Sequence, residues 1–137
     1  MNNTLYIVWN QNNELGISII DEQHRGIVAT INAFYYFINR GNGLNALRPT
    51  LNMLSQYTSI HFRTEETLMK ETGYKGIEEH ILLHEKLKQN TIEIAREATT
   101  YKEPEIALKF LKSWWLGHIN GKDKLYAPHL KKTLGIQ

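Results

Sequence analysis

The segment "IEEHILLHEKLKQNTIEIAREA", residues 77–98, decides the fold class of this chain. Its apolar and small residues recur at spacings of three and four, and two histidines share their stripe: Ile77, His80, His84, Leu87, Thr91, Ile94 and Ala98. This spacing places side chains on one face of an α-helix, whereas a half-buried strand alternates every second residue. The segment therefore predicts an amphipathic helix that packs one face against other helices.

The rest of the chain predicts three more helices of this kind. With the first segment, the expected helices cover about residues 21–39, 48–70, 75–98 and 104–131. Asp21 is the expected N-cap of the first helix. Pro49 is tolerated only in a first turn, so the second helix should begin between Leu44 and Leu51. Pro104 can open the fourth helix, and Pro128 should kink or break it near its end.

Short connections between the predicted helices make neighbouring helices antiparallel. Residues 1 to about 20, which include Trp9 and Gly16, lack a clear period and should form an irregular arm. Strand-like alternation is absent from the sequence. We therefore expect one all-α domain over residues 1–137, an antiparallel up-down-up-down four-helix bundle with an N-terminal arm.

The composition excludes several classes of protein. The chain has 137 residues, 42% of them hydrophobic, and a formal net charge of +2, with basic residues spread along its length. This balance does not favour nucleic-acid binding. The absence of cysteine excludes disulfides and thiolate metal sites. No signal peptide or membrane-spanning run is visible, so we expect a cytoplasmic protein without a membrane partner.

Five of the six histidines fall on or beside the apolar stripe of a predicted helix, and each helix contributes at least one: His24, His61, His80, His84 and His118. A single histidine on such a face is usually a hydrogen-bonded core residue. Five in one small core are harder to satisfy, because each neutral ring needs a donor and an acceptor. A shared metal centre would satisfy all five. The sixth, His129, follows Pro128 and is expected at the surface.

Carboxylates accompany these histidines. His61 and Glu65 are four residues apart and lie on one helical face, whereas Glu66 is expected to be an ordinary exposed charge. His118 and Asp123 are five residues apart, or about 140° around a regular helix. One hypothesis is that Gly117 and Gly121, which flank His118, permit a local bulge that turns Asp123 towards the metal. By spacing alone, Asp123 could equally be a surface charge.

Five histidines and two carboxylates exceed the needs of a single metal ion. The set suits two metals, with the carboxylates as bridges. Nitrogen-rich ligation favours iron, zinc, copper or nickel over magnesium or calcium.

The motifs occur in a fixed order, one for each predicted helix: "IDEQH" (20–24), "HFRTEE" (61–66), "HILLH" (80–84) and "HINGKD" (118–123). Each motif alone is weak, but their order together is highly specific. The constellation resembles the hemerythrin family, in particular its single-domain bacterial members, and the match covers essentially the whole chain.

The resemblance implies a non-haem diiron centre with an oxo or hydroxo bridge, which binds O2 reversibly as hydroperoxide for carriage, storage or sensing and is not an enzyme. It implies that His24 and His61 ligate one iron and that three histidines, His80, His84 and His118, ligate the other. Glu65 and Asp123 would bridge the pair. The iron with two histidines would keep an open position for O2 or for a small anion such as azide.

The resemblance also implies an O2 pocket lined by five residues: Ile27, Phe62, Trp114, Trp115 and Ile119. In bacterial members of the family, the residue three before the fourth-helix histidine is commonly leucine, and here it is Trp115. We therefore expect Trp115 to narrow the pocket, gate its entrance or donate its indole N–H there, without affecting metal binding.

Three other functions compete with reversible O2 binding. They are a diiron oxidase or peroxidase, an iron storage or detoxification protein, and a structural zinc bundle. Ferritin-like diiron sites use Glu-x-x-His pairs. The stripes of this chain carry no such pair, and this favours reversible binding.

Overall fold

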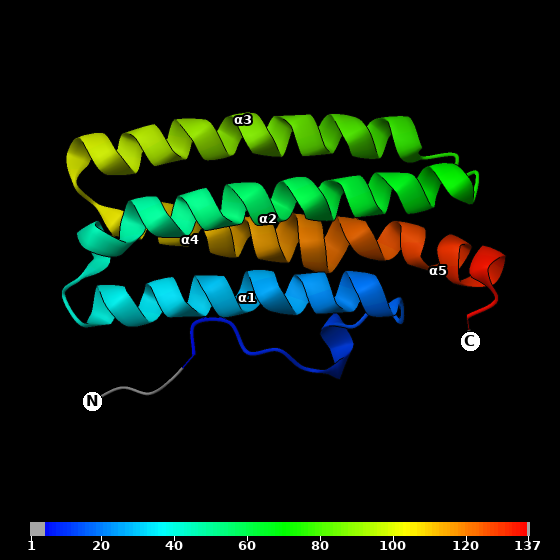
Figure 1. Cartoon of the computed structure of the whole chain (residues 1–137), viewed down its shortest axis with the longest axis horizontal. Helices are drawn as coiled ribbons and strands as arrows, with labels where there is room; N and C mark the ends of the chain where they lie inside the picture. Colours follow the sequence, from blue (N-terminus) through cyan, green and yellow to red (C-terminus); the bar gives the residue numbers. More distant parts are fainter. Residues whose placement is uncertain (1–4, 137) are drawn as a thin grey trace.

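The computed structural model describes residues 5–136 and consists of helices joined by short turns (Figure 1). The elements are η1 (Gln11–Asn13), α1 (Ser18–Asn39), α2 (Gly43–Glu71), α3 (Ile77–Tyr101), α4 (Pro104–Trp114), the π-helical η2 (Trp115–Lys122) and α5 (Asp123–Leu134). The last three run on as one column, so that the chain forms four helical columns. Each column contacts the next one in the chain, and α4 returns to α1. The predicted antiparallel four-helix bundle is confirmed.

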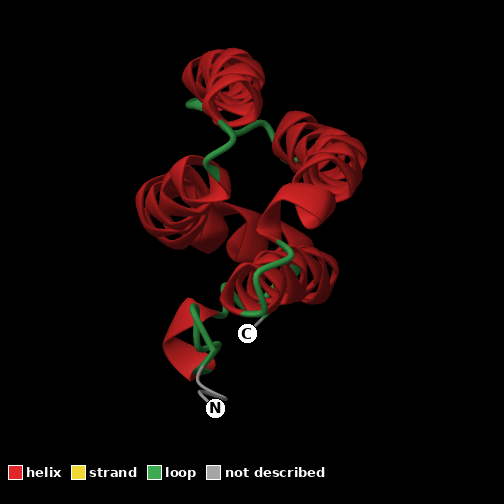
Figure 2. Ribbon diagram, turned by 90° about the vertical axis from the view of Figure 1, so that its left-hand side faces the viewer, coloured by secondary structure: helices red, strands yellow, loops and turns green. Residues whose placement is uncertain are grey.

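The N-terminal arm lies outside the bundle along α1 (Figures 1 and 2). Asn32 on α1 holds it through two hydrogen bonds. The backbone N–H of Ile7 donates to Asn32 Oδ1 at 2.9 Å, and Asn32 Nδ2 donates to the carbonyl of Ile7 at 2.8 Å. The pairing resembles one rung of a sheet, and it fixes this stretch of the arm against the first helix.

The first helix begins at Ser18, three residues before the predicted N-cap, so the prediction for Asp21 was wrong. Asp21 lies buried inside the first turn and folds its carboxylate back onto the arm. Its oxygens accept hydrogen bonds from the backbone N–H groups of Leu15 at 2.7 Å and Gly16 at 3.1 Å. The acid therefore fixes the angle at which the arm enters α1, and its charge also suits the positive end of the helix.

The second and third helices are longer than the sequence suggested. The second begins at Gly43, so Pro49 lies inside α2 and not in its first turn. Proline has no N–H, so the carbonyl of Asn45, four residues before Pro49, lacks its helical hydrogen bond. Both residues are exposed, so water can donate a hydrogen bond to this carbonyl. The third helix continues to Tyr101, past its predicted end at about residue 98, and its C-cap Lys102 lies in the left-handed region with φ 55°. Pro104 opens α4 as predicted.

The fourth column departs from regular α-helix where the glycines predicted a bulge. Residues Trp115–Lys122 form π-helix, in which backbone hydrogen bonds span five residues. The wider turn shifts the buried face by one residue, so that Tyr126 is fully buried and Leu125 is 66% exposed. Pro128 does not end the column, because α5 continues to Leu134.

The core is divided into two apolar clusters along the bundle. The larger contains Ile27, Phe62 and Trp115, and the smaller contains Ile20 and Tyr126. His24 lies between Ile20 and Ile27 on α1, and Asp123 lies between Ile119 and Tyr126 on the last column, so the polar residues occupy the layer that separates the two clusters. Within residues 5–136, no helix combines the length and apolar character needed to cross a bilayer.

Candidate metal centre

The first half of the polar layer comes from α1 and α2. His24 Nε2 lies 3.1 Å from His61 Nε2 and 3.2 Å from Asp123 Oδ2. The carboxylate of Glu65, one turn after His61 on α2, contacts His61 Nε2. All four side chains are buried, and each places one potential ligand atom within 4.8 Å of the others. Helical spacing accounts for the pair on α2, and helix packing brings His24 against it.

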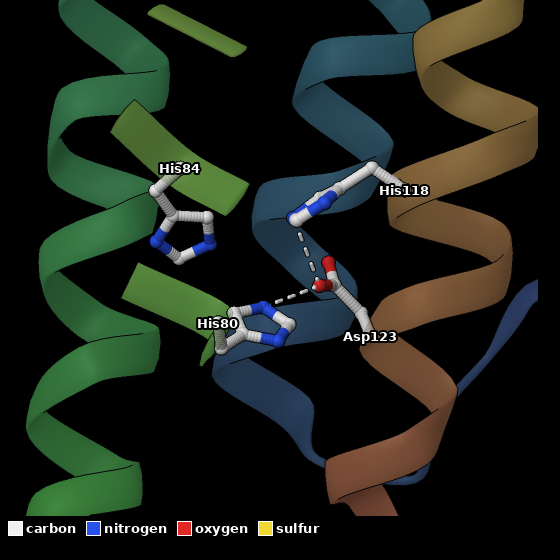
Figure 3. Close-up of side chains that lie close together, drawn as sticks. All are labelled: His80, His84, His118 and Asp123. Carbon is white, nitrogen blue, oxygen red and sulfur yellow. Dashed lines mark ion pairs between the residues drawn. The ribbon is translucent and has the colours of Figure 1, made fainter. Parts of the chain in front are cut away.

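The second half comes from α3 and the last column (Figure 3). His80 Nε2 lies 3.0 Å from Asp123 Oδ1, and His118 Nε2 lies 3.2 Å from the same oxygen. His84 projects from the next turn of α3 towards these groups. The ligand atoms of these four buried residues also lie within 4.8 Å of one another. Every histidine expected in the site is therefore brought to one of the two halves.

The carboxylates join the halves. Asp123 is a member of both groups, with Oδ2 facing His24 and Oδ1 facing His80 and His118. Glu65 likewise reaches across, because its Oε2 lies 3.2 Å from His80 Nε2. Two carboxylates placed between two sets of imidazoles can bridge two cations.

The π-helix explains how His118 and Asp123 reach the same centre. A hydrogen-bonded turn of five residues brings positions i and i+5 to the same side of the column, which a regular helix would separate. Glycine suits position 121 in this turn, because a Cβ there would lie 3.3 Å from the carbonyl oxygen of Leu116, a tight contact. A Cβ on Gly117 would meet no atom within 4 Å among the described residues, so close packing favours glycine at only one of the two positions.

The electrostatics of the site favour cations. Burial alone would lower the pKa of His61, but the carboxylates of Glu65 and Asp123 raise it to about 9. The same competition raises the pKa of His80 to about 9, with Asp123 the stronger partner. Burial would raise the pKa of Asp123, yet the close approach of four imidazoles, led by that of His118, holds it well below its usual range. The site therefore holds two ionised carboxylates and gathers positive charge around them.

The donor atoms fit metal ions better than they fit one another. The Nε2 atoms of His80, His84 and His118 are buried and form no hydrogen bond within residues 5–136, although oxygens lie close by. Both carboxylate oxygens of Glu65 are also buried and form no hydrogen bond among these residues. Close approach without hydrogen-bond geometry is costly for buried polar atoms unless a cation satisfies them. Imidazole and carboxylate ligands together suit iron or zinc.

Two residues that sequence reasoning missed hold the outer nitrogens of the histidine rings. Glu66 Oε2 lies 2.7 Å from His84 Nδ1, so the expectation that Glu66 is an ordinary exposed charge was wrong. Gln23 Oε1 lies 2.8 Å from His61 Nδ1, and its amide nitrogen donates to Thr64 Oγ1 at 3.0 Å. A hydrogen bond to the outer nitrogen fixes the orientation of the ring and leaves Nε2 free to bind metal.

All five residues expected to line an O2 pocket are buried in the larger apolar cluster. Phe62 stacks on His84, with ring centroids 3.8 Å apart and planes at 11°. Trp115 meets His24 edge-on at 6.1 Å, and Trp9 of the arm packs on Trp115 at 5.7 Å. These contacts place an aromatic residue against each half of the site.

Two further residues lie near the site: Tyr126, which the sequence analysis did not consider, and His129, which was expected at the surface. Tyr126 lies fully buried with its ring 5.4 Å from that of His80, and burial, followed by the charges of Glu65 and Asp123, raises its pKa well above the usual value. His129 is half-buried and not a surface residue, because its Nε2 donates to the carbonyl of Thr72 at 2.7 Å and ties α5 to the end of α2.

Comparisons with known proteins agree with this geometry. The family described as "Hemerythrin HHE cation binding domain" matches residues 15–130. A bacteriohemerythrin of Stenotrophomonas maltophilia is 30% identical over 93% of this chain and 84% of its own length, and one of Pseudomonas paraeruginosa is 31% identical over 94% and 84%. A bacteriohemerythrin of Methylococcus capsulatus is 28% identical over 83% of this chain and 88% of its own length.

The fold has a counterpart among solved structures. A crystal structure of a hemerythrin with leucine replaced by alanine superposes with a TM-score of 0.79 at 26% identity, covering 93% of this chain and 98% of that one. The family match, residues 15–130, includes all seven residues of the two histidine and carboxylate groups. The chain is a member of the hemerythrin family.

Proposed function

We propose that this chain is a non-haem diiron protein that binds O2 reversibly. The observation that carries the proposal is the pair of buried ligand groups that share Asp123, one with two histidines and the other with three. Two adjacent groups of this composition match the needs of two bridged iron ions. The names of the relatives, bacteriohemerythrin in three bacteria, support the same function.

The residues take different roles in this proposal. His24 and His61 would hold one iron, three histidines, His80, His84 and His118, would hold the other, and Glu65 and Asp123 would be shared between them. When bound, the iron pair supplies two electrons to O2 and recovers them on release. The half with two histidines has fewer protein ligands, so we assign the O2 position to that half.

The apolar wall supports reversible binding. Ile27 and Ile119 are at most 1% exposed, and Phe62 and Trp115 at most 3%. Such a wall keeps water and acid away from the site, and so protects a bound oxygen species from displacement by protons. Trp115 lies beside His24, where it can control access to the half with two histidines.

The test is reconstitution without air. The protein is loaded with ferrous iron, O2 is added, and the visible spectrum is recorded before and after the gas is removed. A charge-transfer band that forms with O2 and disappears under vacuum is expected. Irreversible bleaching with consumption of O2 would instead indicate an oxidase or an iron-storage protein, and a preference for two zinc ions would indicate a structural zinc site.

A further inference from the structure

A cleft on the outer face of α2 and α3 lies directly behind the half of the centre with three histidines. It consists of two cavities that share Ser59, Phe62 and Lys88. The first, of about 230 Å³, has serine, threonine and Lys88 side chains at part of its lining, but most of its surface is apolar and comes from Leu54, Phe62, Leu87, Ile92, Leu111 and Trp114. It is the more enclosed of the two and can take a short alkyl chain or a single ring.

The second cavity, of about 360 Å³, is polar and cationic. Arg63, Lys70 and Lys88 line it, and Glu66 is the only acid among its lining residues. Arg63 and Lys70 form no ion pair among residues 5–136, and Lys88 lies over the ring of Phe62 at 5.9 Å while its contact with Glu85 is a long one of 3.5 Å. The carboxylate of Glu66 is already directed to His84. The cavity therefore has an excess of positive charge.

We propose that this cleft binds a small amphiphilic organic anion, a carboxylate with a short apolar tail. The carboxylate would lie between Arg63, Lys70 and Lys88, and the tail would enter the apolar cavity across Phe62. The charge of the polar cavity selects an anion, and the apolar cavity that adjoins it selects a tail over a small inorganic ion. This binding does not depend on the proposed O2 chemistry.

The bound anion acts on the metal centre through two residues of the cleft. Phe62 stacks on His84, and Glu66 accepts a hydrogen bond from His84 Nδ1. The negative charge of the bound carboxylate lowers the electrostatic potential at the neighbouring metal centre. This change stabilises the oxidised iron pair, because that pair carries the larger positive charge. O2 binding oxidises the iron in the proposed function, so the anion should increase O2 affinity. This second step rests on that function.

Binding is tested by calorimetry on the iron-loaded protein, with octanoate as the probe and octanol and acetate as comparisons. Octanoate should bind saturably, with a dissociation constant on the order of 0.1–1 mM. Octanol lacks the charge and acetate lacks the tail, so each should bind at least about tenfold more weakly. Equal binding of octanol, or no saturable binding of octanoate, would overturn the proposal.

A charge-matched pair of variants locates the site. Arg63→Gln with Lys70→Gln removes two cations of the cleft, and Lys86→Gln with Lys109→Gln removes two exposed cations elsewhere. Octanoate affinity should fall at least about tenfold in the first double variant and stay unchanged in the second. An equal fall in both would show a nonspecific attraction to net charge and would reject the site.

The effect on the centre is measured separately as the reduction potential of the iron-loaded protein and as its O2 affinity. Saturating octanoate should lower the potential and tighten O2 binding by at least about twofold, and neither change should occur in Arg63→Gln with Lys70→Gln. Octanoate binding without a change in potential would reject the coupling through His84. A protein that binds octanoate but never binds O2 would reject the proposed function and leave the anion site standing.

Discussion

The two halves of the metal centre are built from the same kind of side chain but are held differently. In the half with three histidines, the carboxylate of Glu66 faces the outer nitrogen of His84, whereas in the other half the neutral amide of Gln23 faces that of His61. The outer nitrogen of His24 is buried and has no hydrogen-bond partner among residues 5–136. A carboxylate makes an imidazole a stronger electron donor than an amide does.

This difference indicates that the two halves of the centre have different roles. The half with three histidines contains the imidazole that faces a carboxylate, His84, and this ring is the more electron-rich, as would suit the iron that we propose to be saturated with ligands. In the half with two histidines, His24 is oriented by packing, because Trp115 presses against it and Trp9 covers Trp115. A half in which a histidine is held by packing can admit a ligand by a small movement of its aromatic neighbours. Four experiments test this difference in roles.

The largest effect is expected from Asp123→Asn, because Asp123 belongs to both halves. The neutral amide removes one bridging charge, so iron binding should weaken in both halves, by more than about 100-fold overall. Competition with a coloured chelator measures the affinity, and elemental analysis counts the iron retained. Full retention of one iron would show that Asp123 serves only one half.

The metal-free protein should lose stability as the pH rises from about 6.5 to 9, because each half contains one histidine whose pKa is raised to about 9. In this window the folded state binds more protons than the unfolded state, so stability is complete below pH 6.5 and declines above it. His61 alone contributes up to about 3 kcal/mol. Urea unfolding across this range measures the change.

The iron-loaded protein is the control for the pH experiment, because metal takes the place of these protons and should remove the decline. A metal-free protein that becomes more stable between pH 6.5 and 9 would contradict the charge balance of the site.

The hydrogen bond between Glu66 and the outer nitrogen of His84 is tested by the variant Glu66→Gln. The variant gives the outer nitrogen of His84 a neutral amide partner, as Gln23 is for His61, so the two halves no longer differ in the charge of this partner. Iron affinity of the half with three histidines should fall about tenfold to 100-fold, and the reduction potential should rise. Glu79→Gln, an exposed acid on α3, is the matched control. An unchanged potential in Glu66→Gln would show that the charge of this partner does not distinguish the halves.

Periodicity was sufficient for the parts of the site that lie on regular helix. His61 and Glu65, like His80 and His84, are one turn apart on unbroken α-helix, so spacing alone placed each pair on a buried face. The general fold followed from the same stripes. The start of α1 did not, because Asp21 makes its hydrogen bonds backwards to the arm from within the helix, and no periodic pattern reports such a contact.

The remaining parts depend on interactions between helices or on irregular backbone. Asp123 could not be assigned from spacing, since only the π-helical turn brings it beside His118, and the two glycines that flank His118 were the local sign of that turn. Glu66 and Gln23 lie next to stripe residues and reach histidines through contacts at the edges of the stripes. From the sequence alone, such side chains are indistinguishable from surface residues, because their contacts depend on how the neighbouring helix packs.

The smallest effect, on rates and not on metal content, is expected from Trp115→Leu. The smaller side chain opens space beside His24, so O2 and azide should associate faster while iron content stays the same, at a cost of no more than about 3 kcal/mol of stability. Stopped-flow mixing measures both rates. Trp114→Leu is the control, because Trp114 contacts Phe62 on the side of the half with three histidines. Unchanged rates in Trp115→Leu would remove the gating role, and faster rates in Trp114→Leu alone would move the entrance, and with it the open iron position, to the other half.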